Sequence, residues 1–186
     1  TWGRSRTRPS FLPWGVERSW DDTWINLTAN GPVRHGNRLW FYYSGRSGAH
    51  GAVYPLNHGG IGVAILRVDG FASLRAEERE GYVLTPAFAW PGGALQVNLD
   101  ARRDLASHPG FCQGELRVEI LDGHGNVIPG FGRDQSVPLR ENTANAPDAC
   151  RPCSWQDNRT PAELAGRTVR LRFYLREAHL YGFRAA

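Results

Sequence analysis

The chain has 186 residues, of which 41% are hydrophobic, with 22 Lys and Arg against 18 Asp and Glu and a formal net charge of +4. This apolar content suffices for a packed core, and no stretch approaches the roughly 20 apolar residues of a membrane span, which argues against a membrane protein. Every basic residue is arginine, and the arginines are interleaved with acids along the whole chain without an RNA- or DNA-binding motif, so a nucleic-acid-binding protein is not expected.

Residues 1–58 are rich in Trp, Arg, Gly and Pro. Two stretches in this part predict strands, residues 23–27 and 39–44, and a Gly36-Asn37 turn precedes the second. Strand alternation in 39–44 (LWFYYS) places Trp40 and Tyr42 on one face and Phe41 and Tyr43 on the other. So few strands cannot bury the five tryptophans of this part, which must therefore pack against something else.

From residue 59 onward, strand follows strand. Two β-rich runs, residues 61–74 and 167–183, each consist of two strands joined at a tight turn. In the first run, Asp69-Gly70 is typical of a two-residue hairpin turn. Further strands are predicted at 82–89, 95–100 and 115–121, the last with clean alternation of apolar and charged residues, and a short helical turn at 161–164 begins after Thr160 and ends at Gly166.

About eight strands with almost no helix predict an all-β fold, an antiparallel β-sandwich of jelly-roll type over residues 59–186. The domain boundary is expected at residue 58. Residues 1–58 then form an extension folded against the sandwich.

The three cysteines are too few for a disulfide-rich scaffold or a four-cysteine zinc site. Cys150 and Cys153 have the spacing of a redox motif, but they follow a loop instead of opening a helix after a strand. We therefore expect a structural disulfide that joins Cys112 to Cys150 or Cys153. A disulfide suits an exported protein, so the expected location is extracellular or periplasmic.

Several segments resemble a known family. The runs GIGVAILRVDGFASL, GELRVEILDGHGNVIPGF and LAGRTVRLRFYLREAHLYGF are similar to the C-terminal β-sandwich of bacterial glycoside hydrolase family 32-like proteins. The stretches WGVERSWDD and PVRHGNRLWFYYSGRSGAHG resemble the end of the five-bladed β-propeller that precedes this sandwich. The resemblance covers most of the chain and implies that residues 1–58 are a propeller-derived extension, with most propeller blades before Thr1.

What the resemblance implies for function is a carbohydrate-binding accessory module with a polysaccharide or oligosaccharide as partner. Tryptophan and tyrosine rings stack on the CH faces of sugars, while Arg, Asn and Asp bind the hydroxyl groups. Trp90 and Trp155 are candidates because each lies at a predicted strand edge. The other candidates come from the strand at 39–44, namely Trp40, Tyr42 and Tyr43.

Two alternatives stay open. A small glycoside hydrolase needs two carboxylates about 5 to 9 Å apart, and Asp21 with Asp22 is the best pair, although adjacent acids in a loop are more typical of a turn. Other acids that we considered are Glu115, Glu119, Asp122 and Asp134. The second alternative is a structural sandwich that supports a propeller and binds no sugar. Whether the chain is an enzyme is left undecided, with the balance against it.

No organic cofactor is expected. Asp100, Asp104 and Asp122 carry oxygen ligands of the kind that calcium prefers, so they are the candidates for a structural calcium site. An unfinished propeller blade in residues 1–58 leaves an edge strand and aromatic side chains uncovered, which favours a homodimer.

Overall fold

The computed structural model describes residues 10–48, 58–102 and 114–186. The protein is mostly β, with antiparallel sheets and short 3-10 helices. The chain divides into two compact units, Thr1–Leu66 and Arg67–Ala186. The division lies inside strand β4 (Gly59–Arg67), whereas the change in composition predicted a boundary at residue 58. In the described part of the chain, no helix is long and apolar enough to cross a membrane.

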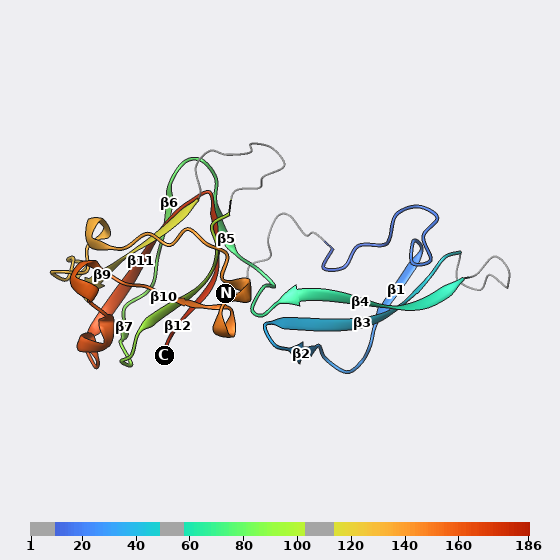
Figure 1. Ribbon diagram of the computed structural model, residues 1–186, viewed down its shortest axis with the longest axis horizontal. Coiled ribbons are helices and arrows are strands. Elements are labelled where there is room, and N and C mark those ends of the chain that lie inside the picture. The colour runs from blue at the N-terminus through green and yellow to red at the C-terminus, as the bar shows by residue number, and fades with distance from the viewer. Residues whose placement is uncertain (1–9, 49–57, 103–113) are drawn as a thin grey trace. The chain divides into compact units, whose positions relative to one another are not determined.

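The first unit is one antiparallel sheet built around β3 (Arg38–Arg46). Strand β1 (Trp24–Leu27) pairs with the C-terminal part of β3, and β2 (Val33–His35) pairs with its N-terminal part. Strand β4 also pairs with β3, and Figure 1 shows these two long strands side by side. Gly36 has a positive φ of 57° in the β2–β3 turn, so the predicted turn and both predicted strands are confirmed.

The second unit contains two sheets. In one sheet β12 is flanked by β8 and β5, with β10 beyond β8; in the other, β11 pairs with β9 along one edge and with β6 and β7 along the other. All of these pairings are antiparallel. The strands are β5 (Leu74–Ala76), β6 (Gly81–Leu84), β7 (Phe88–Ala89), β8 (Leu95–Asp100), β9 (Glu115–Asp122), β10 (Arg151–Pro152), β11 (Thr168–Arg176) and β12 (Ala178–Ala185).

One hydrophobic core lies between the two sheets of this unit (Figure 1). Val97 and Leu99 of β8 meet Val118 of β9 and the β11 residues Leu171 and Phe173, and all five are almost fully buried. Burial of each such side chain contributes about 1.5–3 kcal/mol relative to exposure. The second unit is therefore a β-sandwich, as the alternation of its strands predicted.

The hairpin predicted for residues 61–74 is wrong in its pairing. Strand β4 pairs with β3 and not with β5, while β5 pairs with β12. The turn itself forms, because Asp69 has φ 59° and the Gly70 amide donates to the Arg67 carbonyl at 3.0 Å. The residues of a turn determine its backbone conformation, but they do not determine which strand pairs with the strand that follows. Leu74 lies opposite Leu180 of β12 and joins the sheet of the sandwich.

The two strands and the tight turn predicted for residues 167–183 are confirmed, since Glu177 at φ 48° alone separates β11 from β12. The two strands lie in different sheets and do not pair with each other. The predicted helical turn is confirmed as the 3-10 helix Pro161–Leu164, although the Thr160 side chain makes no capping bond. The remaining 3-10 helices are Arg133–Gln135, Thr143–Asn145, Pro147–Ala149 and Gln156–Asn158.

Candidate functional site

Trp90 and Trp155 belong to the core of the sandwich. Their side chains are only 2% and 1% exposed. The Trp155 indole donates to the Val118 carbonyl at 3.0 Å and its ring packs edge-on against Phe131 at 5.1 Å, while Trp90 packs against Phe88 at 6.2 Å. Neither ring has a free face on which a sugar can stack. The expectation that their positions at strand edges present them to solvent is corrected by this burial.

The aromatic residues of β3 divide between the two faces of the first sheet, as alternation predicted. The Trp40 ring lies 6.4 Å from that of Tyr42 and 5.3 Å from His35 of β2. On the opposite face, Tyr43 stacks on Trp20 at 5.6 Å with an angle of 15° between the rings. Trp40 and Tyr42 therefore form one cluster, and the third β3 candidate, Tyr43, belongs to another.

Strand β1 adds a tryptophan that sequence reasoning missed. Trp24 pairs with Arg46 across the β1–β3 ladder, so it shares the face of Trp40 and Tyr42. The Arg46 guanidinium lies over the Trp24 ring at 5.7 Å. The signal was present in the alternation of residues 24–27, but its use required the register against β3. We call the surface formed by Trp24, His35, Trp40, Tyr42 and Arg46 the aromatic face.

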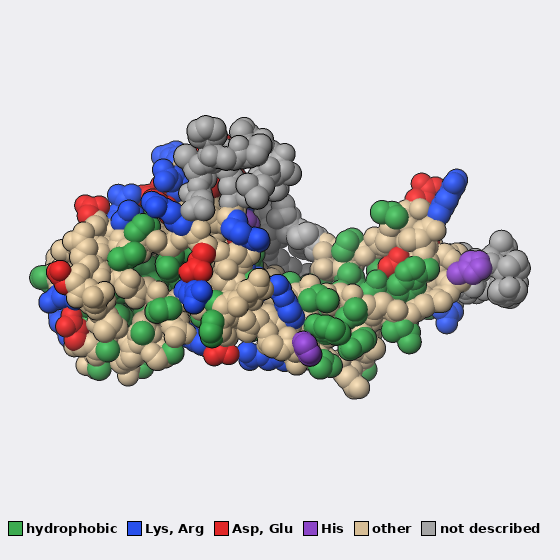
Figure 2. Space-filling view, viewed as in Figure 1, with side chains coloured by type: hydrophobic (Ala, Val, Ile, Leu, Met, Phe, Trp, Pro, Cys, Tyr) green, Lys and Arg blue, Asp and Glu red, His purple; other side chains and the backbone are tan. Residues whose placement is uncertain are grey.

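Strand β4 extends the aromatic face with aliphatic side chains. A Cβ atom at Gly62 would lie 2.5 Å from the Tyr43 ring, so Gly62 faces the Tyr43 side of the sheet. Successive residues of a strand alternate between faces, which places Ile61, Val63 and Ile65 on the side of Trp40 and Tyr42. Ile61 is 82% exposed and Ile65 is 57% exposed. Figure 2 shows hydrophobic side chains gathered over this sheet.

The charge on the aromatic face is positive. Arg38 lies opposite His35 in the β2–β3 ladder, and Arg46 lies opposite Trp24 in the β1–β3 ladder. Among the paired positions of β1, β2 and β3, none carries an Asp or Glu. Guanidinium groups bind carboxylate and sulfate groups through two parallel hydrogen bonds. The face therefore combines ring surfaces for stacking with cations for anionic groups.

Asp21 lies on the opposite face of the sheet. Its carboxylate accepts hydrogen bonds from the Ser19 hydroxyl at 2.7 Å and from the Tyr43 hydroxyl at 2.9 Å. The hydrogen bond from Ser19, followed by that from Tyr43, lowers the pKa of Asp21 below its ordinary value. The Asp22 carboxylate accepts from the Arg18 amide and the Thr23 hydroxyl, both at 2.8 Å. Both acids thus hold the loop before β1, and a lowered pKa is opposite to what a general acid needs.

The two glutamates of β9 lie in ion pairs on the outer face of the sandwich. Glu115 contacts Arg140 at 2.9 Å and Arg176 at 3.4 Å, and Glu119 accepts from the Tyr174 hydroxyl at 2.8 Å. Burial raises the pKa of Glu115, but the Arg140 hydrogen bond and the neighbouring arginine charges outweigh burial and lower it. Four positions along one strand separate the Cα atoms by about 13 Å, and the two carboxylates are held by different partners and not turned toward a common cleft.

The remaining acids serve turns or surface positions. The Asp122 carboxylate accepts from the amides of His124 and Asn126, both at 2.9 Å, and Asp134 is exposed. Asp100 accepts from Arg102 at 3.1 Å and from Asn142 at 2.7 Å. Asp104, the other calcium candidate, lies outside the described residues. Within the described ranges, no three His, Cys, Asp or Glu side chains are grouped so that they could hold a metal ion.

The described cysteines, Cys150 and Cys153, are both free and buried. Burial raises the pKa of the Cys150 thiol and raises that of Cys153 far more strongly. Cys112, the expected disulfide partner, lies outside the described residues. The expected bond is therefore not present at either described cysteine, and burial gives both thiols the character of core side chains.

The chain was compared with protein-family models, with curated proteins and with solved structures. None of the three comparisons gives a match.

Proposed function

We propose that the protein binds polysaccharide through the aromatic face of its first unit, as an accessory module of a carbohydrate-active protein. The observation that carries this proposal is the ring pair of Trp40 and Tyr42 on one face of β3, with Tyr42 42% exposed. From the Trp40 position to the Arg46 position, β3 rises by about 20 Å, which leaves room for several sugar units in a row. Flat sheet surfaces with exposed rings suit extended chains.

The charge of the aromatic face favours acidic polysaccharides, those that carry uronate or sulfate groups. Arg46 is held over Trp24, so a sugar ring stacked on this surface meets a guanidinium at its edge. No Asp or Glu at the paired positions of β1, β2 and β3 opposes an anion. Long-range attraction of this kind also accelerates association and weakens as salt is added.

The proposed kinship with glycoside hydrolase family 32-like proteins, expected from sequence runs such as GIGVAILRVDGFASL, leads to the same function. In this proposal the second unit is a jelly-roll sandwich and the first derives from the end of a propeller. The whole protein then acts outside the cytoplasm, in the extracellular space or the periplasm, where polysaccharides are met.

Affinity gel electrophoresis tests the proposal. The protein is run through gels that contain polygalacturonate, dextran sulfate, xylan or mannan, and we expect retardation by the two acidic polymers. Trp40→Ala and Tyr42→Ala should each remove the retardation. Tyr82→Ala is the matched control, because Tyr82 is an exposed tyrosine of the second unit. Absence of retardation by every polymer, or equal loss in the control, contradicts the proposal.

A second candidate function is supported by the row of Ile61, Val63 and Ile65 on β4. Three exposed aliphatic side chains in a row are typical of a protein interface, and a second copy of the chain would cover them as a homodimer. Light scattering after size-exclusion chromatography measures the mass directly. A dimer that Ile61→Asp converts to a folded monomer supports this function, and a wild-type monomer at all concentrations excludes it.

A further inference from the structure

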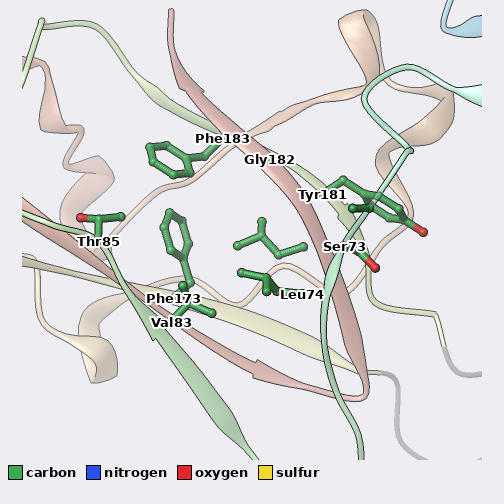
Figure 3. Close-up of a pocket in the computed structure, with 10 residues that line it drawn as sticks. Ser73, Leu74, Val83, Thr85, Phe173, Tyr181, Gly182 and Phe183 are labelled. Carbon is green, nitrogen blue, oxygen red and sulfur yellow. The ribbon is translucent and has the colours of Figure 1, made fainter. Parts of the chain in front are cut away.

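The sandwich contains an apolar pocket of about 330 Å³. It lies between the two sheets on the side where β5 and β6 form their edges, and Figure 3 shows residues of both sheets around it. Both edge strands are short, three residues in β5 and four in β6. Because these edge strands are short, they leave the space between the two sheets partly open at this edge.

Aromatic rings form the inner part of the pocket. Phe173 of β11 is fully buried, and its ring centroid lies 5.1 Å from that of Phe183 of β12. Leu74 of β5 and Phe183 are 54% and 42% exposed. These two side chains leave apolar area in water that a ligand would cover, which favours binding by roughly 25 cal/mol for each Å² removed from water.

The other end of the pocket carries polar groups. The Ser73 hydroxyl lies 3.0 Å from Nδ1 of His179, and the His179 ring stacks on Tyr181 at 6.2 Å. A β-bulge in β12 lies between Leu180 and Gly182, and bulges of this kind redirect side chains. In Figure 3, Ser73 and Tyr181 lie at one end of the pocket and the two phenylalanine rings at the other.

The lining residues carry no formal charge, and the Arg67 guanidinium that lies over the Tyr181 ring at 4.1 Å donates hydrogen bonds to Asn98 and Thr143. The Ser73 hydroxyl contacts His179, and burial, followed by the charge of Arg75, lowers the pKa of His179. The imidazole is therefore neutral at pH 7. A lining without charged side chains disfavours an ion, because no lining side chain supplies a counter-charge in place of the hydration of the ion. A volume near the lower end of the range for ligand sites restricts the ligand to a small molecule.

We propose that the β5–β6 edge of the sandwich is a binding site for a small uncharged apolar molecule that carries one hydrogen-bonding group. The apolar body lies against Phe173 and Phe183, and the polar group meets the Ser73 hydroxyl. This site is independent of the aromatic face, because it lies in the other unit and uses none of the same residues.

The test uses N-phenyl-1-naphthylamine, an uncharged probe whose fluorescence rises in apolar surroundings. We expect saturable binding to the full chain, and displacement by decan-1-ol at concentrations at least about tenfold lower than by decanoate, because the carboxylate is not accepted. Equal displacement by the alcohol and the carboxylate would overturn the class of ligand.

Two variants locate the probe. Leu74→Asp places a charge at the pocket and should weaken probe binding at least about tenfold. Leu84→Asp is the matched control, since Leu84 pairs with Arg172 on the outer face of the same edge and is 38% exposed. Tyr42→Ala should leave probe binding unchanged, which excludes binding at the aromatic face.

Circular dichroism establishes that each variant is folded. If Leu74→Asp does not fold, Leu74→Ala replaces it, with a smaller but measurable loss of affinity expected. Probe binding that is unchanged in folded Leu74→Asp, or absent from the wild type, rejects the site. A wild type that binds the probe but retains no polysaccharide leaves this inference standing and rejects only the proposed function.

Discussion

The Tyr43 hydroxyl donates a hydrogen bond of 2.9 Å to the Asp21 carboxylate, while the Tyr43 ring stacks on Trp20. Two adjacent residues of the loop before β1 are thus held by one tyrosine of the central strand. Gly45 and Gly62 make this possible, because a Cβ at Gly45 would lie 2.7 Å from Trp20 and one at Gly62 would lie 2.5 Å from Tyr43. Trp20 and Tyr43 can pack closely on the sheet because Gly45 and Gly62 have no side chain there.

Removal of this hydroxyl should loosen the loop without affecting the sandwich. In Tyr43→Phe, the midpoint of the thermal transition followed by tryptophan fluorescence should fall by a few degrees, because the Asp21 carboxylate loses a hydrogen bond. Polysaccharide retardation should stay within twofold of the wild type, since Tyr43 lies on the face opposite to Trp40. Loss of retardation in this variant would contradict the assignment of the faces.

Gly62→Ala tests the close contact between the Gly62 backbone and the Tyr43 ring directly. Its Cβ would enter the Tyr43 ring, which is held by stacking on Trp20 and by the hydrogen bond to Asp21, so we expect a destabilisation of about 1–3 kcal/mol in chemical unfolding. Gly31→Ala is the control, because a Cβ at Gly31 meets no atom within 4 Å. Equal stability of the two variants would show that Tyr43 is free to move.

Arg46→Gln should weaken retardation by polygalacturonate about fivefold at low salt, the size expected for one exposed cation. The effect should shrink at high salt because the charge is screened. Arg79→Gln makes the same change of net charge at an exposed position in the second unit. If both variants behave alike, net charge and not the aromatic face accounts for binding.

Glu115→Gln should lower the free energy of unfolding by about 1–2 kcal/mol at pH 7, because Arg140 and Arg176 lose their partner. The folded-state pKa of Glu115 lies below the 4.5 of a free glutamate. The carboxylate therefore stabilises the fold above pH 4.5, and this contribution is lost as the pH falls through the folded pKa. Urea unfolding from pH 7 to pH 3 should therefore show the free energies of unfolding of Glu115→Gln and the wild type becoming equal.

Glu163→Gln is the control for that series, since Glu163 is a half-exposed partner of Arg159 at 3.7 Å. Its free energy of unfolding should differ little from that of the wild type at every pH. If the difference in free energy of unfolding between Glu115→Gln and the wild type increased as the pH fell, the sign of the pKa shift would be contradicted.

The thiols give a further prediction. In native Cys112→Ser, Cys150 and Cys153 should react slowly with Ellman's reagent because both are buried. In guanidinium without reductant, the wild type should release at least two reactive thiols. One reactive thiol would instead show that two of the three cysteines are joined in a disulfide.

Strands with clean alternation were predictable from sequence, as β9 and β11 show, because each buries one face against the core. The partner of a strand was not. The Asp69-Gly70 turn gives no information on the sheet that β5 joins, since the pairing of Leu74 with Leu180 spans more than a hundred residues. That Trp40 and Tyr42 lie on the same face of the sheet was predictable from their spacing of two residues in a strand.

The exposure of Trp90 and Trp155 and the pocket at β5 and β6 did not follow from local patterns. Trp155 packs in the core, and its indole donates to the Val118 carbonyl of β9, a contact that is distant in sequence. The pocket depends on a bulge in β12 and on two short edges, which become visible only once the register is known.

The positions of β11 and β12 bear on how the chain is made. β11 is the central strand of its sheet, and β12 is one of the two inner strands of the other sheet, beside β8. A nascent chain that has emerged only as far as Gly166 lacks both of these strands. The apolar side chains of the earlier strands therefore remain exposed until β11 and β12 have been synthesised. The sandwich then forms late and through contacts distant in sequence, which makes the folding of β proteins slow.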